Sequence, residues 1–222
     1  MYSILLSSFE KGIVVVKEEL KKIIKKDFNV VVIPWSFAVE LKTKNIKDFF
    51  DEDKENKYLG ELKELGIKYE NIKVLDCYND SKEYMIDSIN NSSMILFTGG
   101  NPEMLYKKVE EAGLINCLKN YKKIVIGSSA GAELQLKKYF ITKKNNYYKK
   151  FCFYEGFGII KEEFYFDVHS VNRGRYLPSL EKKSKDLKKN IYCIFDTGAI
   201  IYNRNTKELN CYGDVIKYEN EV

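Results

Sequence analysis

The chain contains 222 residues, of which 45% are hydrophobic and 31% are charged. This is enough apolar material for a folded core, so a disordered chain is not expected. The 37 lysines and arginines and the 32 aspartates and glutamates leave a formal net charge of +5. Because the basic residues are scattered among acidic ones, a nucleic-acid-binding protein is disfavoured. The longest apolar runs are far shorter than the roughly 20 residues of a membrane span, and the first residues show no secretory signal, so we expect a soluble, cytoplasmic protein with no membrane partner.

The first 126 residues have the sequence pattern of alternating strands and helices. Short β-branched runs alternate with amphipathic stretches of roughly 10 to 20 residues, which is the pattern of βαβ units. The predicted strands are residues 3–7, 30–33, 72–75, 94–97 and 123–126. The predicted helices are residues 13–26, 59–65, 81–89 and 102–118, and the charge-rich stretch 42–57 is expected to be a solvated helix and loop. We therefore predict an α/β fold with three layers, a mostly parallel sheet between helices on both faces.

The last third of the sequence has shorter predicted elements. Strands are expected at 164–168, 192–195 and 199–202, a helix at 177–188, a terminal hairpin around 203–217, and a surface loop at 143–150. No internal repeat or long linker interrupts the chain. We predict one domain over residues 1–222.

A metal or redox site has little support in the composition. The chain has one histidine, and its carboxylates lack the spacing of known metal-binding motifs. The cysteines include no Cys-x-x-Cys pair, and we expect them to be reduced and mostly buried. They are Cys77, Cys117, Cys152, Cys193 and Cys211. No metal and no cofactor are expected.

The strongest local motif follows the strand predicted at 123–126. The segment Gly127–Ser128–Ser129–Ala130–Gly131 has the G-x-S-x-G pattern of a nucleophile elbow, and a helical stretch at 133–137 is predicted after it. A sharp turn exposes the central serine, and its neighbours two positions away must be small. Ser129 is therefore the candidate nucleophile, although serine and glycine are also ordinary helix-cap residues.

A serine nucleophile needs a base within hydrogen-bond reach. His169, the single histidine, lies at the end of the strand predicted at 164–168 and is the candidate base. Two of the three arginines, Arg173 and Arg175, follow it closely in a chain whose basic residues are otherwise almost all lysine. Because arginine binds carboxylates bidentately, they suggest an anionic group on the substrate. A plain surface loop is the alternative for this segment.

A second glycine cluster follows the strand predicted at 94–97. Thr98, Gly99, Gly100, Asn101 and Pro102 lie at the carboxyl end of that strand, where open α/β sheets bind their ligands. The cluster lacks the phosphate-binding glycine patterns. As half of an oxyanion hole, the N–H of Gly100 would act together with that of Ala130.

Together these segments resemble the dipeptidase E and cyanophycinase family of serine peptidases, in order and in spacing. The resemblance rests on residues 98–102, 127–132 and 167–169 and on the two arginines that follow, and it extends over approximately residues 4–213. It implies a class I glutamine amidotransferase-like, flavodoxin-like fold, with serine where the amidotransferases use cysteine. It also implies a Ser-His-acid hydrolase in which Ser129 is the nucleophile and His169 the base.

The third member of the family's triad is a carboxylate that follows the histidine, between two strands. Asp196, 27 residues after His169 (196 − 169), is the candidate. The family usually has glutamate there, and aspartate is one methylene shorter. Asp167 is the rival, and Glu133 and Glu155 also remain open. Ser170 is a further departure, because relatives often have an aromatic residue there, and it bears on substrate preference.

The leading hypothesis is a serine peptidase for short peptides, with dipeptides carrying an N-terminal aspartate suggested by similarity to dipeptidase E. Arg173 or Arg175 would hold the aspartate side chain. The order serine, histidine, acid differs from that of α/β-hydrolases and disfavours a lipase-like enzyme. The alternatives are an esterase or amidase for a non-peptide substrate and a catalytically silent binder of an anionic peptide or metabolite. A homodimer is left open.

Overall fold

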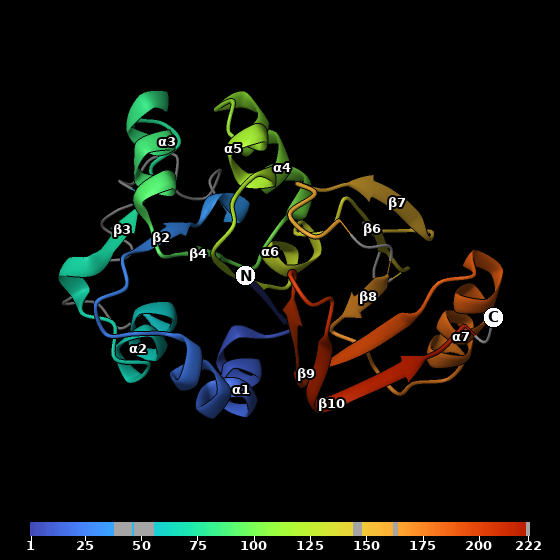
Figure 1. Ribbon diagram of the computed structural model, residues 1–222. Coiled ribbons are helices and arrows are strands. Elements are labelled where there is room, and N and C mark those ends of the chain that lie inside the picture. Colours follow the sequence, from blue (N-terminus) through green and yellow to red (C-terminus); the bar gives the residue numbers. More distant parts are fainter. Residues whose placement is uncertain (38–45, 47–55, 144–147, 162–163, 221–222) are drawn as a thin grey trace.

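A computed structural model describes residues 1–37, 46, 56–143, 148–161 and 164–220. Its centre is an eight-stranded, mostly parallel sheet (Figure 1). Five neighbouring parallel strands form most of it, in the spatial order β1 (Tyr2–Leu6), β5 (Ile124–Ser128), β4 (Met94–Phe97), β2 (Val30–Ile33) and β3 (Ile72–Val74). These strands are nearly continuous apolar runs, as expected for a parallel sheet covered on both faces.

Helices cover both faces of this sheet, so the predicted three-layer α/β fold is confirmed (Figure 1). One face packs against α1 (Phe9–Ile23) and α2 (Lys57–Glu64). The other packs against α3 (Lys82–Asn91), α4 (Pro102–Glu111) and α5 (Ile115–Lys119). Successive strand residues point to opposite layers: Ile4 and Leu6 belong to the first core, and Leu5 to the second.

The carboxyl-terminal part is organised around one long strand, β9 (Ile191–Asn203). The strand β10 (Leu209–Tyr218) pairs with β9 along one edge, with one irregularity, and confirms the predicted terminal hairpin. Two different strands pair with the other edge of β9. The strand β8 (Tyr165–Val168) pairs in parallel with residues 191–194, and β1 pairs antiparallel with residues 199–203. The carboxyl ends of β8 and β1 therefore approach residues 195–198 from opposite directions. Two separate strands, 192–195 and 199–202, were predicted here, and the structure joins them.

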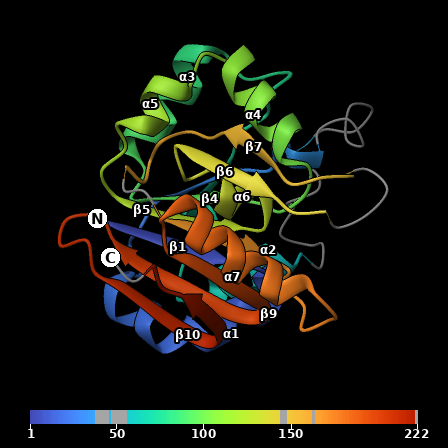
Figure 2. The same cartoon turned by 90° about the vertical axis from the view of Figure 1, so that its right-hand side faces the viewer.

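A second, two-stranded antiparallel sheet was not predicted. It consists of β6 (Lys138–Ile141) and β7 (Cys152–Glu155). Figure 2 shows it beside α7 (Tyr176–Leu187). The two elements share a small apolar core in which Phe140 packs with Leu177 and Leu180. The surface loop predicted at 143–150 falls between these two strands in the sequence, and its residues 144–147 lie outside the described part of the chain.

Two predicted helices differ from the structure. The helix predicted at 102–118 is divided into α4 and α5, because Gly113 adopts a left-handed conformation (φ +69°) that ends α4. The helix predicted at 133–137 is replaced by the short α6 (Ala130–Glu133). Beyond it, the Leu134 carbonyl accepts the N–H of Phe157 and the Lys137 carbonyl accepts that of Gly156, so this backbone bonds to a distant segment. The charge-rich stretch 42–57 lies almost wholly outside the described residues.

Two expectations from composition can be compared with the structure. Within the described residues, no helix has the length and hydropathy needed to cross a membrane. All five cysteines are free, but only Cys193 is buried, and Cys211 is exposed. The prediction that the cysteines are mostly buried is therefore wrong.

Candidate active site

Ser129 lies at a sharp turn between β5 and α6, at the carboxyl edge of the sheet. Its backbone has φ +50° and ψ −116°, a region that side-chain-bearing residues rarely adopt. Its N–H donates to the carbonyl of Leu6 at the end of β1. A Cβ on Gly127 would stand 2.1 Å from the Gly131 carbonyl oxygen, and a Cβ on Gly131 would stand 2.5 Å from Phe97 Cβ. Both flanking positions therefore require glycine, as the sequence pattern indicates.

The structure brings His169 and Asp196 to this serine. His169 Nε2 lies 2.9 Å from Ser129 Oγ, and His169 Nδ1 lies 2.6 Å from Asp196 Oδ1. The strand pairing explains this arrangement, because His169 directly follows β8 and Asp196 lies in the part of β9 between its pairings with β8 and β1. The side chains of His169 and Asp196 are 46% and 45% exposed, so a substrate can reach them.

Ser7, which the sequence analysis did not single out, joins these two residues. Its hydroxyl accepts the main-chain N–H of His169 at 2.6 Å and donates to Asp196 Oδ1 at 3.3 Å. Ser7 is fully buried and directly follows β1. The signal for Ser7 in the sequence was its position, as a small polar residue at the carboxyl end of a predicted strand. Such residues are common at strand ends, so this signal is weak. The end of β1 thus contacts all three candidate catalytic residues, through the Leu6 carbonyl and the Ser7 hydroxyl.

The carboxyl of Asp196 is kept ionised by its neighbours. Partial burial acts to raise its pKa, but the hydrogen bond and charge of His169, the charge of Lys11 and the Ser7 hydroxyl together lower the pKa below the usual value for aspartate. Lys11 Nζ, on the first turns of α1, lies 3.8 Å from Asp196 Oδ2. An ionised Asp196 favours the His169 tautomer with a proton on Nδ1, which leaves Nε2 free to accept one.

The loop that contains Gly99 and Gly100 lies against the Ser129 turn. A Cβ on Gly99 would stand 3.3 Å from Ser129 Cβ, and Gly100 has φ +140°. Two residues that the sequence analysis did not single out hold this loop. Ser36, in the short 3-10 helix Trp35–Phe37, donates to the Gly99 carbonyl and accepts the Asn101 N–H through its own carbonyl. Tyr58 of α2 accepts the Gly99 N–H through its hydroxyl.

The rival carboxylates have other partners. Asp167 is fully buried and accepts hydrogen bonds from the hydroxyls of Ser170 and Tyr176, both at 2.6 Å. Glu155 pairs with Lys138 across the β6–β7 sheet. Glu133 is buried in α6. Of the four candidates, Asp196 is the one whose carboxylate lies within hydrogen-bond distance of the imidazole.

Arg173 and Arg175 lie in the exposed segment between β8 and α7. Arg173 accepts the Tyr176 N–H through its carbonyl, and Arg175 accepts that of Ser179. Neither guanidinium forms an ion pair with a residue in the described ranges. The structure therefore leaves both side chains accessible, without a contact that directs either of them at Ser129.

Comparison with known proteins agrees with this fold. The model of peptidase family S51 matches residues 5–209. A crystal structure of a protein assigned as a peptidase E from Listeria monocytogenes EGD-e is similar, with a TM-score of 0.66 and 19% identity over 96% of this chain and 98% of that one. A peptidase from an acI-B1 actinobacterium gives a TM-score of 0.65 and 18% identity over 99% and 91%. No curated protein matches in sequence.

The fold and the family match define the class of protein as a serine-type peptidase. More particularly, the chain belongs to peptidase family S51, the dipeptidase E family, because the family model covers nearly all of it. The resemblance drawn from the three sequence segments is confirmed.

Proposed function

We propose that this peptidase hydrolyses short peptides through a triad of Ser129, His169 and Asp196. The observation that carries the proposal is the continuous hydrogen-bonded chain from Ser129 Oγ through the imidazole to Asp196 Oδ1. This is the arrangement that activates a serine hydroxyl, which is otherwise a weak nucleophile.

In the first step, Ser129 Oγ attacks the scissile carbonyl carbon while His169 Nε2 takes the hydroxyl proton. Asp196 stabilises the imidazolium that forms and holds the ring in place. The proton then passes from Nε2 to the leaving amine as the C–N bond breaks, which leaves an acyl-enzyme. Water attacks the acyl group with His169 again as the base, and the carboxylic acid product and free serine are released.

The negative charge on the carbonyl oxygen would be bound by the N–H groups of Gly100 and Ala130. The close packing of Gly99 against Ser129 supports this role, because it holds the next N–H of the loop near the turn. Each such donor typically contributes about 3 kcal/mol to the transition state. Ser36 and Tyr58 would act as positioning residues for this loop.

The proposed substrates are dipeptides with an N-terminal aspartate, a preference suggested by similarity to dipeptidase E. The exposed arginines that follow His169 are the proposed partners of the aspartate side chain. A carboxylate held bidentately by arginine gives more directional recognition than one held by lysine.

The test is hydrolysis of Asp-Leu, Glu-Leu, Ala-Leu and N-acetyl-Asp-Leu by the wild type and by Ser129→Ala. We expect cleavage of free Asp-Leu and its loss in the variant. No cleavage of any peptide contradicts the dipeptidase assignment. In that case, labelling of Ser129 by a fluorophosphonate favours another amidase or esterase, and absence of labelling favours a silent binder.

The arginine proposal has its own test. Arg173→Ala or Arg175→Ala is expected to raise KM for Asp-Leu more than KM for Ala-Leu, because only the acidic peptide loses an ionic contact. Lys182→Ala, at an exposed position of α7, is the control and should leave both values unchanged. Equal effects on the two peptides would contradict the role of the arginine concerned.

A further inference from the structure

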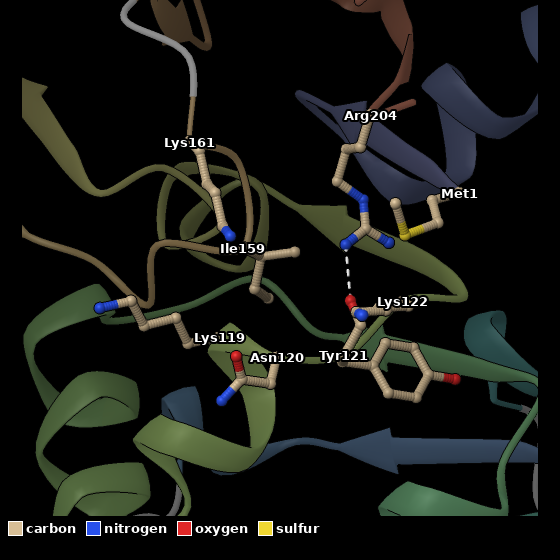
Figure 3. A pocket seen from close by; sticks show the side chains of 8 residues that line it. All are labelled: Met1, Lys119, Asn120, Tyr121, Lys122, Ile159, Lys161 and Arg204. Atoms are coloured by element: carbon tan, nitrogen blue, oxygen red, sulfur yellow. Dashed lines mark hydrogen bonds between the residues drawn. The ribbon is translucent and has the colours of Figure 1, made fainter. Parts of the chain in front are cut away.

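A hollow lies at the end of the sheet opposite Ser129. It has a volume of about 140 Å³ and is formed where the chain enters β1 and β5 and leaves β9. Lys123 and Ser129 lie at opposite ends of β5, six residues apart, which corresponds to about 20 Å. Figure 3 shows the residues that line the hollow, which are Met1, Lys119, Asn120, Tyr121, Lys122, Ile159, Lys161 and Arg204.

The lining is strongly basic. Four of its eight residues are cationic and none is acidic, although the chain as a whole has nearly as many acidic as basic residues. The four cations come from three separate segments, residues 119–122, Lys161 and Arg204, and in Figure 3 Lys161 and Arg204 extend toward the hollow from different sides. None of the lysines Lys119, Lys122 and Lys161 forms an ion pair with any residue that the structure describes. The fold therefore gathers positive charge here without supplying a counter-charge from the described residues.

The unbalanced positive charge is most destabilising at Arg204. Its guanidinium donates to the main-chain carbonyls of Tyr121, Tyr2 and Lys123, which are neutral groups. Its Nε is buried and has no hydrogen-bond partner among the described residues. Burial lowers the pKa of Arg204 to about 10. A partly buried cation without an anionic partner is destabilising, so an anion in the hollow would stabilise the protein.

We propose that this hollow binds a small anion that carries a phosphate group. The volume corresponds to about five water molecules, which is sufficient for a phosphate group. Lysine ammonium groups act as point charges and suit the several oxygens of a phosphate. The site lies too far from Ser129 to hold part of the scissile peptide, so the proposal goes beyond the peptidase activity and does not depend on it.

Isothermal titration calorimetry with inorganic phosphate tests the proposal, with the ionic strength held constant by sodium chloride. The titration uses the full chain, which includes Glu162 and Glu163, two residues that follow Lys161 in the sequence and are outside the described part of the structure. We expect saturable binding at one site with a Kd of about 1 mM or tighter. A second titration with glycerol 3-phosphate distinguishes the free ion from a phosphate monoester as the natural ligand.

Matched double variants locate the site. Lys122→Gln with Lys161→Gln is expected to weaken phosphate binding at least tenfold, whereas Lys25→Gln with Lys182→Gln removes the same charge from exposed positions outside the hollow and should leave the Kd unchanged. Thermal unfolding without phosphate checks that both variants are folded. Failure of both ligands to bind at up to about 10 mM, or equal weakening in the two variants, would overturn the proposal.

Discussion

The Ser7 hydroxyl holds two residues of the proposed triad at once. It accepts the N–H of His169 and donates to Asp196, both of which are more than 150 positions away in the sequence. His169 has φ +53°, a left-handed conformation that is uncommon for residues with a side chain. Such strained residues persist where their surroundings fix them, and the Ser7 hydrogen bond is one of the contacts that fix His169. Ser7 is therefore a positioning residue for the base and the acid.

We expect Ser7→Ala to reduce kcat by at least about tenfold with little change in KM, because a small displacement of the base slows proton transfer. The variant also loses one of the hydrogen bonds that lower the pKa of Asp196. The pKa of this carboxyl therefore rises, and the loss of activity toward acidic pH should begin at a higher pH than in the wild type. Steady-state kinetics across pH measures both effects.

Two further variants separate positioning from a general loss of stability. Ser8→Ala changes the neighbouring serine, whose side chain makes no capping hydrogen bond to α1, and should have near wild-type kinetics. Ser7→Thr keeps the hydroxyl and should restore part of kcat. A kcat of Ser7→Ala equal to that of Ser8→Ala, or an unchanged pH profile, would exclude the positioning role.

The sequence was informative for residues whose type is itself unusual. Ser129 lies in a glycine pattern that a sharp turn requires. His169 is the only histidine, and Asp196 was chosen from the resemblance to the family. Ser7, Ser36 and Tyr58 escaped attention because serine and tyrosine are common. Their importance comes from contacts with residues 41 to 189 positions away, and a local pattern cannot show such contacts.

At the scale of elements, the turn between β5 and α6 depends on close backbone packing. A Cβ on Gly131 would stand 2.6 Å from the Phe97 carbonyl oxygen, and backbone cannot yield as a flexible side chain can. Gly60, in the middle of α2, is the opposite case, because a Cβ there would meet no atom within 4 Å. The two glycines therefore allow opposite predictions for the same substitution.

Gly131→Ala is expected to lower the free energy of unfolding by about 2 kcal/mol or more, in the range of overpacking changes. Gly60→Ala should raise it by about 0.5–1 kcal/mol, because alanine has the higher helix propensity. Urea unfolding of both variants and the wild type measures these changes. Equal stability of the two variants would contradict the packing described for the turn.

The predicted elements succeeded where hydrophobic pattern alone determines the structure. The central strands are short, continuous apolar runs between amphipathic helices, and all five of them were predicted. Apart from the helix divided at Gly113, the failures are elements that depend on contacts with distant parts of the sequence. The segment after α6 is fixed by main-chain bonds to residues 156–160, and β6 and β7 stabilise each other. The union of two predicted strands into β9 depends on β10, which spans both of them.

On the scale of the whole molecule, the proposed triad joins the centre of the sheet to its carboxyl-terminal margin. Ser129 follows β5, which is paired on both sides, by β1 and β4. His169 follows β8, which pairs with β9 alone among the described strands, and Asp196 lies where β9 has neither β8 nor β1 beside it. The nucleophile is thus attached to the most enclosed part of the fold and the other two groups to a more open part.

This difference predicts the order of local opening in native-state hydrogen exchange. Peptides from β1, β4 and β5, whose residues are almost all buried, should exchange only when the whole protein unfolds. Peptides from β10, an edge strand in which every residue is at least partly exposed, should exchange earlier, and those from β8 should lie between them. Mass spectrometry of peptic fragments measures this order. If β8 and β10 were as protected as β5, the carboxyl-terminal margin would unfold together with the core, and the three groups of the proposed triad would belong to one cooperative unit.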